Sequence, residues 1–246
     1  MADNSQFSQH ISRQFNEELE DVRQQVLAMG GLVEEQLNDA LNALIEHDGK
    51  QAQKVIEGDV KVNGFEVSID EECARILAKR QPAAGDLRLL VAIIKTITDL
   101  ERVGDEAEKI AKMASHLSFE VNNDAQPTKK HFGAVMHMGQ HVMIMLRHAL
   151  DAFARLDVQE ALKVAKQEVI ADREYDAISR QLITYIMEDP RAISGGLDVL
   201  WAARSLERIG DHAKNISEYV IYLVCGKDVR HISINELEQV TKADKS

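Results

Sequence analysis

One segment occurs twice in the sequence, and each copy carries two carboxylates that stand four residues apart. It reads DLERVGDEAEKI at 99–110 and SLERIGDHAKNI at 205–216. Helical residues i and i+4 share one face, so Glu101 with Asp105, and Glu207 with Asp211, each form a two-carboxylate patch. The acids repel by a few tenths of a kcal/mol, and the glycine between them costs about 1 kcal/mol relative to alanine. Because both copies carry these two energetic costs, we expect the two segments to share a function. The glycine would let another helix or a bound species approach closely.

Each patch is preceded, one predicted helix earlier, by a matching pair of oxygen-bearing side chains. These pairs are Asp59 with Asn63 in the first half and Glu168 with Asp172 in the second. If neighbouring helices bring the pairs together, each half gathers four oxygen donors, with Asp99 and Asp176 as candidate additional ligands. An oxygen-rich cluster without Cys or His suits hard cations such as Mg²⁺, Mn²⁺, Ca²⁺ or ferric iron. The sequence therefore predicts one metal site in each half.

Simpler explanations compete with metal binding. A single acid pair on a helix is most often a solvated face with Arg or Lys nearby, but the duplication and the second pair favour metal. His137 and His141 are also one turn apart and could ligate zinc. Because the sequence does not supply the third ligand that zinc needs, a surface pair is the favoured interpretation. We find no phosphate-binding glycine loop, nucleophile elbow or Glu-x-x-His pair, and hence no assembled catalytic group.

The elements that must position these residues are helices. Apolar periodicity predicts six of them, at about 8–46, 49–79, 86–119, 128–154, 158–189 and 196–225. Asp48, Asp86 and Asp157 are the expected caps. The stretch around Pro127 reads as a linker, and the polar tail reads as frayed or a short helix.

The chain is an internal duplication. A shift of 109 residues aligns 29–48 with 138–157 at eight identities in 20 positions, and a shift of 106 aligns the two acid-bearing segments. This repeat predicts an all-α fold of two tandem, pseudo-symmetric three-helix bundles. The expected domains are 1–122 and 123–226, followed by a polar C-terminal tail at 227–246.

Composition narrows the class of protein. The formal net charge is −12, which disfavours nucleic-acid binding because phosphate contacts need a basic surface. Two cysteines without metal or redox spacing suit a reducing compartment. With no apolar signal-peptide core and no apolar run of membrane-spanning length, a cytoplasmic location is expected.

Four stretches carry a resemblance to a known family. They are GDVKVNGFEVSIDEEC (58–73), RQPAAGDLRLLVAIIKTITDLERVGDEAEKIAK (80–112), EVIADREYDAI (168–178) and LERIGDHAKNI (206–216). Together with the repeat, this pattern resembles the PhoU family of bacterial phosphate-signalling proteins, over roughly residues 8–225.

The resemblance implies two similar three-helix bundles side by side, each with a surface metal site of iron, zinc, magnesium or manganese. It places Glu101, Asp105, Glu207 and Asp211 at the motif positions, with Glu168 and Asp172 facing the last pair. At Asn63 an amide replaces the second acid, which makes the first site less charged.

The resemblance also implies a cytoplasmic regulator rather than an enzyme. Such a protein negatively regulates phosphate-starvation genes, links the phosphate ABC transporter and its ATPase subunit to a sensor histidine kinase, and often forms a homodimer. It reaches the membrane only through those partners.

Two rivals belong to other classes. One is a carboxylate-bridged metalloenzyme, either a phosphohydrolase or an oxidase, and the missing Glu-x-x-His pair counts against the oxidase. The other is a helical scaffold whose acids are simply solvated.

Overall fold

Seven α-helices follow one another in the computed structural model, which describes residues 4–119 and 129–243. They are α1 (Asn4–Glu46), α2 (Gly49–Arg80), α3 (Ala84–Phe119), α4 (Lys129–Arg155), α5 (Val158–Glu188), α6 (Ile193–Cys225) and α7 (Ile234–Ala243), with a 3-10 turn η1 (Pro190–Ala192) before α6. The all-α prediction is confirmed, and the tail contains one short helix. Apart from its last residue, the predicted linker lies outside the described residues. Within the described ranges, no helix has an apolar stretch of the length that a bilayer crossing requires.

Local signals place the helix starts in two cases and mislead in a third. Asp48 accepts hydrogen bonds from the backbone of the second and third residues of α2, and Asp157 does the same for α5. Asp86 does not cap α3, which begins two residues earlier at Ala84. Its carboxylate lies inside the first turn, where the helix dipole favours a negative charge.

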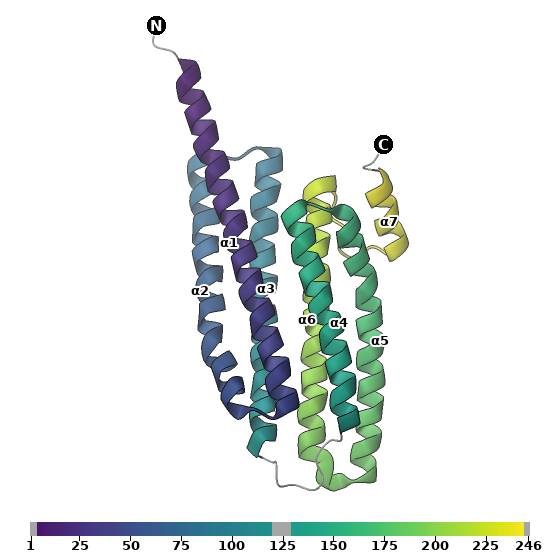
Figure 1. The fold of residues 1–246 in the computed structure, drawn as a ribbon. Coiled ribbons are helices and arrows are strands. Elements are labelled where there is room, and N and C mark those ends of the chain that lie inside the picture. The colour runs from purple at the N-terminus through teal and green to yellow at the C-terminus, as the bar shows by residue number, and fades with distance from the viewer. Residues whose placement is uncertain (1–3, 120–128, 244–246) are drawn as a thin grey trace.

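The helices form two groups of three that pack along their length (Figure 1). In each group, α1–α2–α3 and α4–α5–α6, every helix packs against the other two, while α3 against α6 and α1 against α4 join the groups. Helix α7 packs mainly on α5. Buried apolar residues from both groups belong to one connected core. The groups are therefore structurally continuous, and the proposed domain boundaries stay a prediction.

Two glycines related by the repeat interlock the groups. A Cβ added at Gly30 of α1 would lie 2.7 Å from Cδ2 of Leu150 on α4. A Cβ added at Gly139 of α4 would lie 2.8 Å from Cδ2 of Leu41 on α1. Each half thus receives the leucine of the other in the gap left by its own glycine. This reciprocal contact is what a local two-fold relation between the halves produces.

The contact between α3 and α6 is polar at its centre. Asp99 on α3 is only 3% exposed. Its Oδ1 accepts hydrogen bonds from His212 Nδ1 at 2.6 Å and Asn215 Nδ2 at 3.2 Å, and its Oδ2 accepts one from the Tyr219 hydroxyl at 2.7 Å. The expectation that Asp99 is an additional metal ligand is therefore wrong, because α6 uses both of its oxygens.

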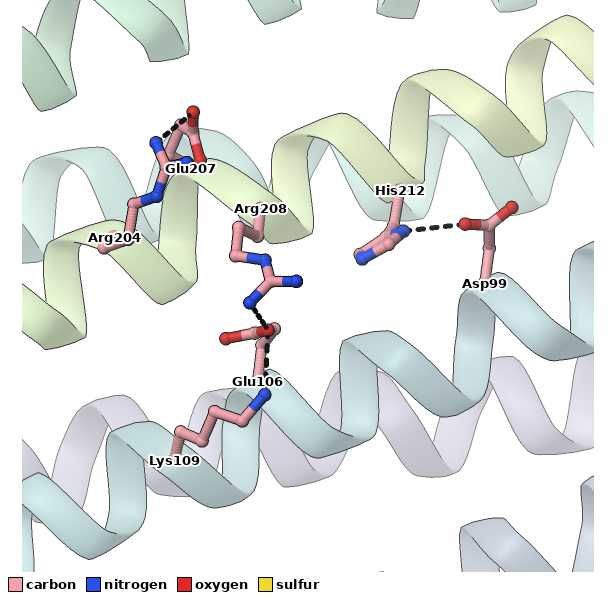
Figure 2. Close-up of polar contacts among 7 residues, drawn as sticks. All are labelled: Asp99, Glu106, Lys109, Arg204, Glu207, Arg208 and His212. Carbon is pink, nitrogen blue, oxygen red and sulfur yellow. Dashed lines mark hydrogen bonds and ion pairs between the residues drawn. The ribbon is translucent and has the colours of Figure 1, made fainter.

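A second carboxylate is buried at the same contact between α3 and α6, the α3–α6 seam. Oε1 of Glu106 on α3 lies 3.0 Å from Nη1 of Arg208 on α6 and 3.0 Å from Nζ of Lys109. Figure 2 shows the Glu106 and Asp99 contacts side by side between the two helices. Arg208 therefore pairs with Glu106 across the seam rather than with the neighbouring Glu207.

The glycine interlock can be tested by paired substitutions in α1. Gly30→Ala should lower the free energy of unfolding by about 1–2 kcal/mol, because Leu150 must leave a tightly packed position. Gly31→Ala is the matched control, since, apart from the adjacent residues and backbone of its own helix, no atom of the described chain lies within 4 Å of a Cβ added there. It should raise the free energy of unfolding by up to about 1 kcal/mol through helix propensity alone. Urea denaturation measures both, and equal stabilisation by the two variants would contradict the interlock.

Candidate metal centres

The first acidic cluster is built where α2 crosses α3. Asp59 on α2 is buried, and its Oδ1 accepts a hydrogen bond from Gln36 Nε2 of α1 at 2.9 Å. Its Oδ2 accepts one from Asn63 Nδ2 at 3.1 Å. A Cβ at Gly104 of α3 would lie 3.2 Å from Asp59 Oδ1, which is tighter than ordinary contact. The glycine in the repeated segment therefore makes room for this carboxylate, as the sequence predicted.

Three neighbouring carboxylates act on Glu101 in this cluster. Burial raises the pKa of Glu101, and the negative charges of Asp105, Glu66 and Asp59 raise it further. The predicted residues of α2 and α3 thus lie near enough to interact, but among the described residues no three carboxylates of this cluster have oxygens within 4.8 Å of one another. The structure also adds Glu66, which stands two helical turns after Asp59 and so falls on the same stripe of α2.

Two amide oxygens in this cluster have no hydrogen-bond donor among the described residues. Oε1 of Gln36 and Oδ1 of Asn63 are both buried and unpaired. Gln36 is 7% exposed, and its Oε1 would be 3.3 Å from a Cβ at Gly104. Unpaired buried acceptors are costly, and here they lie among acids that offer no donors when ionised. A hard cation would satisfy amide and carboxylate oxygens together, so this donor set fits one.

The second acidic cluster lies between α5 and α6. Glu168, Asp172 and Asp211 each offer a carboxylate oxygen, and the three oxygens lie within 4.8 Å of one another. Burial raises the pKa of Asp211, and the charges of Glu168 and Asp172 add to that rise. Burial likewise raises the pKa of Asp172, with Glu168 the largest charged contributor. Three of the four predicted ligands thus already converge on a position that a small cation could occupy.

The second cluster carries its own positive charges. Lys214 Nζ donates to Glu168 Oε1 at 3.0 Å, and Arg204 Nη1 donates to Glu207 Oε1 at 2.7 Å. Glu207, the fourth predicted ligand, turns toward Arg204 and away from the α3 seam (Figure 2). Its other oxygen is buried without a hydrogen-bond partner in the described part of the chain. A metal ion would therefore compete with Lys214 for Glu168.

Four residues of these clusters were missed by sequence reasoning: Gln36, Glu66, Arg204 and Lys214. Lys214 stands three residues after Asp211, and Arg204 three before Glu207, so helical spacing alone could have found both. Asp176 was expected as an additional ligand, and its charge raises the pKa of Asp172. The expected close approach is not found at Gly210, where an added Cβ would make only an ordinary contact at 3.6 Å with Ala171.

One more buried acid adjoins the second cluster. Burial raises the pKa of Glu218 to about 7, although the nearby Lys214 ammonium opposes that rise. Glu218 follows Lys214 by one turn of α6, so the Glu218 carboxyl and the Lys214 ammonium lie on the same face of the helix.

The chain is similar to proteins of one family along nearly its whole length. A family model described as "PhoU domain" matches residues 26–114 and again 135–220. A Pseudomonas aeruginosa protein named "Phosphate-specific transport system accessory protein PhoU homolog" is 54% identical over 239 residues, 97% of each chain. The Escherichia coli "Phosphate-specific transport system accessory protein PhoU" is 47% identical over 238 residues, 97% of this chain and 96% of that one.

Two solved structures share the fold. The crystal structure of PhoU from Pseudomonas aeruginosa matches with a TM-score of 0.82 at 56% identity, covering 87% of this chain and 100% of that one. The phosphate transport system regulatory protein PhoU from Streptococcus pneumoniae matches with a TM-score of 0.79 at 32% identity, covering 87% of this chain and 99% of that one. The arrangement of helices in Figure 1 is thus one that crystal structures also show.

The raised pKa of Glu218 predicts a pH-dependent stability. Its carboxyl titrates near 7 in the folded chain against an ordinary value of 4.5, so the folded state holds a proton that the unfolded state has lost. The stabilisation is full below pH 4.5 and is lost as the pH rises through about 7. Glu218→Gln, which cannot ionise, should exceed the wild type in free energy of unfolding by about 3 kcal/mol near pH 8. The difference should fall to within about 1 kcal/mol near pH 5.

Urea denaturation at both pH values measures this difference. Glu71→Gln, on the exposed surface of α2, is the control and should show no pH-dependent gain. The same gain for Glu218→Gln at both pH values would contradict a buried, protonated carboxyl.

Proposed function

The chain belongs to the PhoU family, and from that premise we propose that it is a metal-binding, non-enzymatic adaptor that negatively regulates phosphate-starvation signalling and high-affinity phosphate uptake. It links the phosphate ABC transporter, through the ATPase subunit, to a sensor histidine kinase. The single observation that carries this proposal is the near-complete overlap with the Escherichia coli accessory protein at 47% identity. The printed names of the relatives, "accessory protein" and "regulatory protein", support an adaptor role.

The proposed mechanism is protein contact in the cytoplasm. The net charge of −12 suits a protein that meets partner surfaces rather than nucleic acid. The partners bring the protein to the membrane, and it acts as a homodimer. The continuous core supports this role, since a rigid bundle can present fixed surfaces to two partners at once.

Metal ions belong to the proposal as structural elements of the surface. Asp59, Asn63, Glu101 and Asp105 would hold one ion or cluster, which is iron, zinc, manganese or magnesium. Glu168, Asp172, Glu207 and Asp211 would hold the other. Each site joins an outer helix to an inner one, α2 to α3 and α5 to α6. A bound cation would neutralise the carboxylates whose pKa values burial now raises, and so stabilise the ionised form.

Deleting the gene tests the regulatory function. Phosphate-starvation genes should be expressed in phosphate-rich medium, and the wild-type chain should restore repression because it carries the link between transporter and kinase. The measurement is transcript abundance, combined with a pull-down of the histidine kinase and the transporter ATPase. Unchanged expression in the deletion strain, or a pull-down that lacks both partners, would refute the adaptor.

Titration of the metal-free chain with Mn²⁺ tests the second metal site and the competition between the metal and the Lys214 ammonium. Glu207→Ala with Asp211→Ala should abolish binding in the second half. Lys214→Met should raise the affinity there about tenfold, because a metal no longer displaces an ammonium worth about 1.5 kcal/mol from Glu168. Lys163→Met is the control, since Lys163 pairs with Glu160 on the same helix as Glu168 but outside the cluster.

Calorimetry reads the affinity, and elemental analysis reads the stoichiometry. Full metal occupancy in the double acid variant would disprove the site, and equal gains for the two lysine variants would disprove the competition. Turnover of a phosphate ester or an oxidisable substrate by the metal-loaded chain would instead favour the metalloenzyme.

A further inference from the structure

A glutamate on α5 contacts both of the histidines that stand one turn apart on α4. Nδ1 of His141 lies 2.9 Å from Oε2 of Glu174, and Nε2 of His137 lies 3.4 Å from Oε1 of the same carboxylate. The two histidines stand one helical turn apart. The sequence lacked a third ligand for them, and the packing of α4 against α5 supplies it.

We propose that His137, His141 and Glu174 form a Zn²⁺ site of a different kind from the acidic clusters. Two imidazoles and one carboxylate are three of the four ligands of a tetrahedral zinc centre, and water completes it. Imidazole ligands favour zinc over magnesium and calcium, which prefer oxygen. The carboxylate now accepts the contacts of both rings, so it stands where it can share one cation with them.

This site is separate from the second acidic cluster, although both use α5. Glu174 and Asp172 are two residues apart, so their side chains leave opposite sides of the helix. Asp172 faces Asp211 on α6, whereas Glu174 faces the histidines on α4. The site therefore stands even if the acidic clusters bind nothing.

Binding of one ion requires the two rings to move closer together, because among the described residues the ligand atoms of His137, His141 and Glu174 do not all lie within 4.8 Å of one another. The His137 side chain is 77% exposed, while those of His141 and Glu174 are 17% and 21% exposed. His141 and Glu174 are thus held at the edge of the α4–α5 interface, and the exposed ring of His137 can rotate toward them. Side chains one turn apart on a helix have Cβ atoms about 5–6 Å apart, which suits two ligands of one ion.

The repeat provides an internal control for this proposal. In the first half the aligned positions hold Ala28, Leu32 and Phe65, none of which can bind a metal. The chain should therefore hold one zinc of this kind, in the second half only. Nearby, His148 also pairs with a glutamate of α5, with Nδ1 3.0 Å from Glu160 Oε1. However, Ile144 and Ala152, one turn to either side of it, are not ligands.

The test titrates the full chain with Zn²⁺ in excess Mg²⁺, which competes for the acidic clusters. In the wild type the imidazole nitrogen resonances of both His137 and His141 should shift on Zn²⁺ binding, a change that Zn²⁺ held by the acidic clusters does not produce. The double variant His137→Ala with His141→Leu, which copies the first half, should lose at least about tenfold in affinity. Glu174→Gln should weaken binding as well, and His148→Ala should leave it unchanged.

The measurement on the wild type does not depend on how the variants fold. A Zn²⁺-induced shift of neither imidazole, or of only one, would overturn the three-ligand site. So would an unchanged affinity in the double variant, or an equal loss in His148→Ala. Failure of the Mn²⁺ titration would leave this outcome untouched, because the ligands are different residues.

Discussion

The relative placement of the two halves depends on one buried carboxylate. Asp99 is almost without solvent, and an ionised carboxylate in that position is costly unless donors surround it. Its three donors, on His212, Asn215 and Tyr219, all come from one face of α6. A slide of α6 by one turn would remove them from the carboxylate. The apolar core favours packing of the halves in general, whereas this network selects one register.

The seam also explains why the repeat is not symmetric in chemistry. The residue aligned with Asp99 is Ser205, and the residue aligned with His212 is Glu106. Glu106 is buried too, and it takes its charge balance from Arg208 and Lys109. Arg208 is thereby withdrawn from Glu207, which pairs with Arg204 instead. The seam thus changes the electrostatics of the second acidic cluster, even though its own residues are not ligands.

The sequence predicted what depends on local rules and missed what depends on packing between distant segments. Helix ranges, the caps at Asp48 and Asp157, and the repeat follow from periodicity and short-range hydrogen bonding. Asp86 failed as a cap because an acid is stabilised both at the cap and within the first turn, and the sequence does not distinguish these positions. Gln36 and Glu174 reach their clusters from a different helix. Only the tertiary fold sets those contacts.

The burial of the repeated residues shows which of their identities packing can explain. Leu100, Ala107 and Ile110, and their counterparts in the second half, are fully buried, so a shared core accounts for their identity. Packing gives no such account of the paired acids, since Glu101 and Asp105 are only partly buried, as are Glu207 and Asp211. Surface positions usually tolerate substitution within about 0.5 kcal/mol, yet both halves hold two repelling acids one turn apart. The proposed cation would explain that repetition. It would also explain why the surroundings can differ, since amides in one half and basic side chains in the other would adjust the same pair of carboxylates.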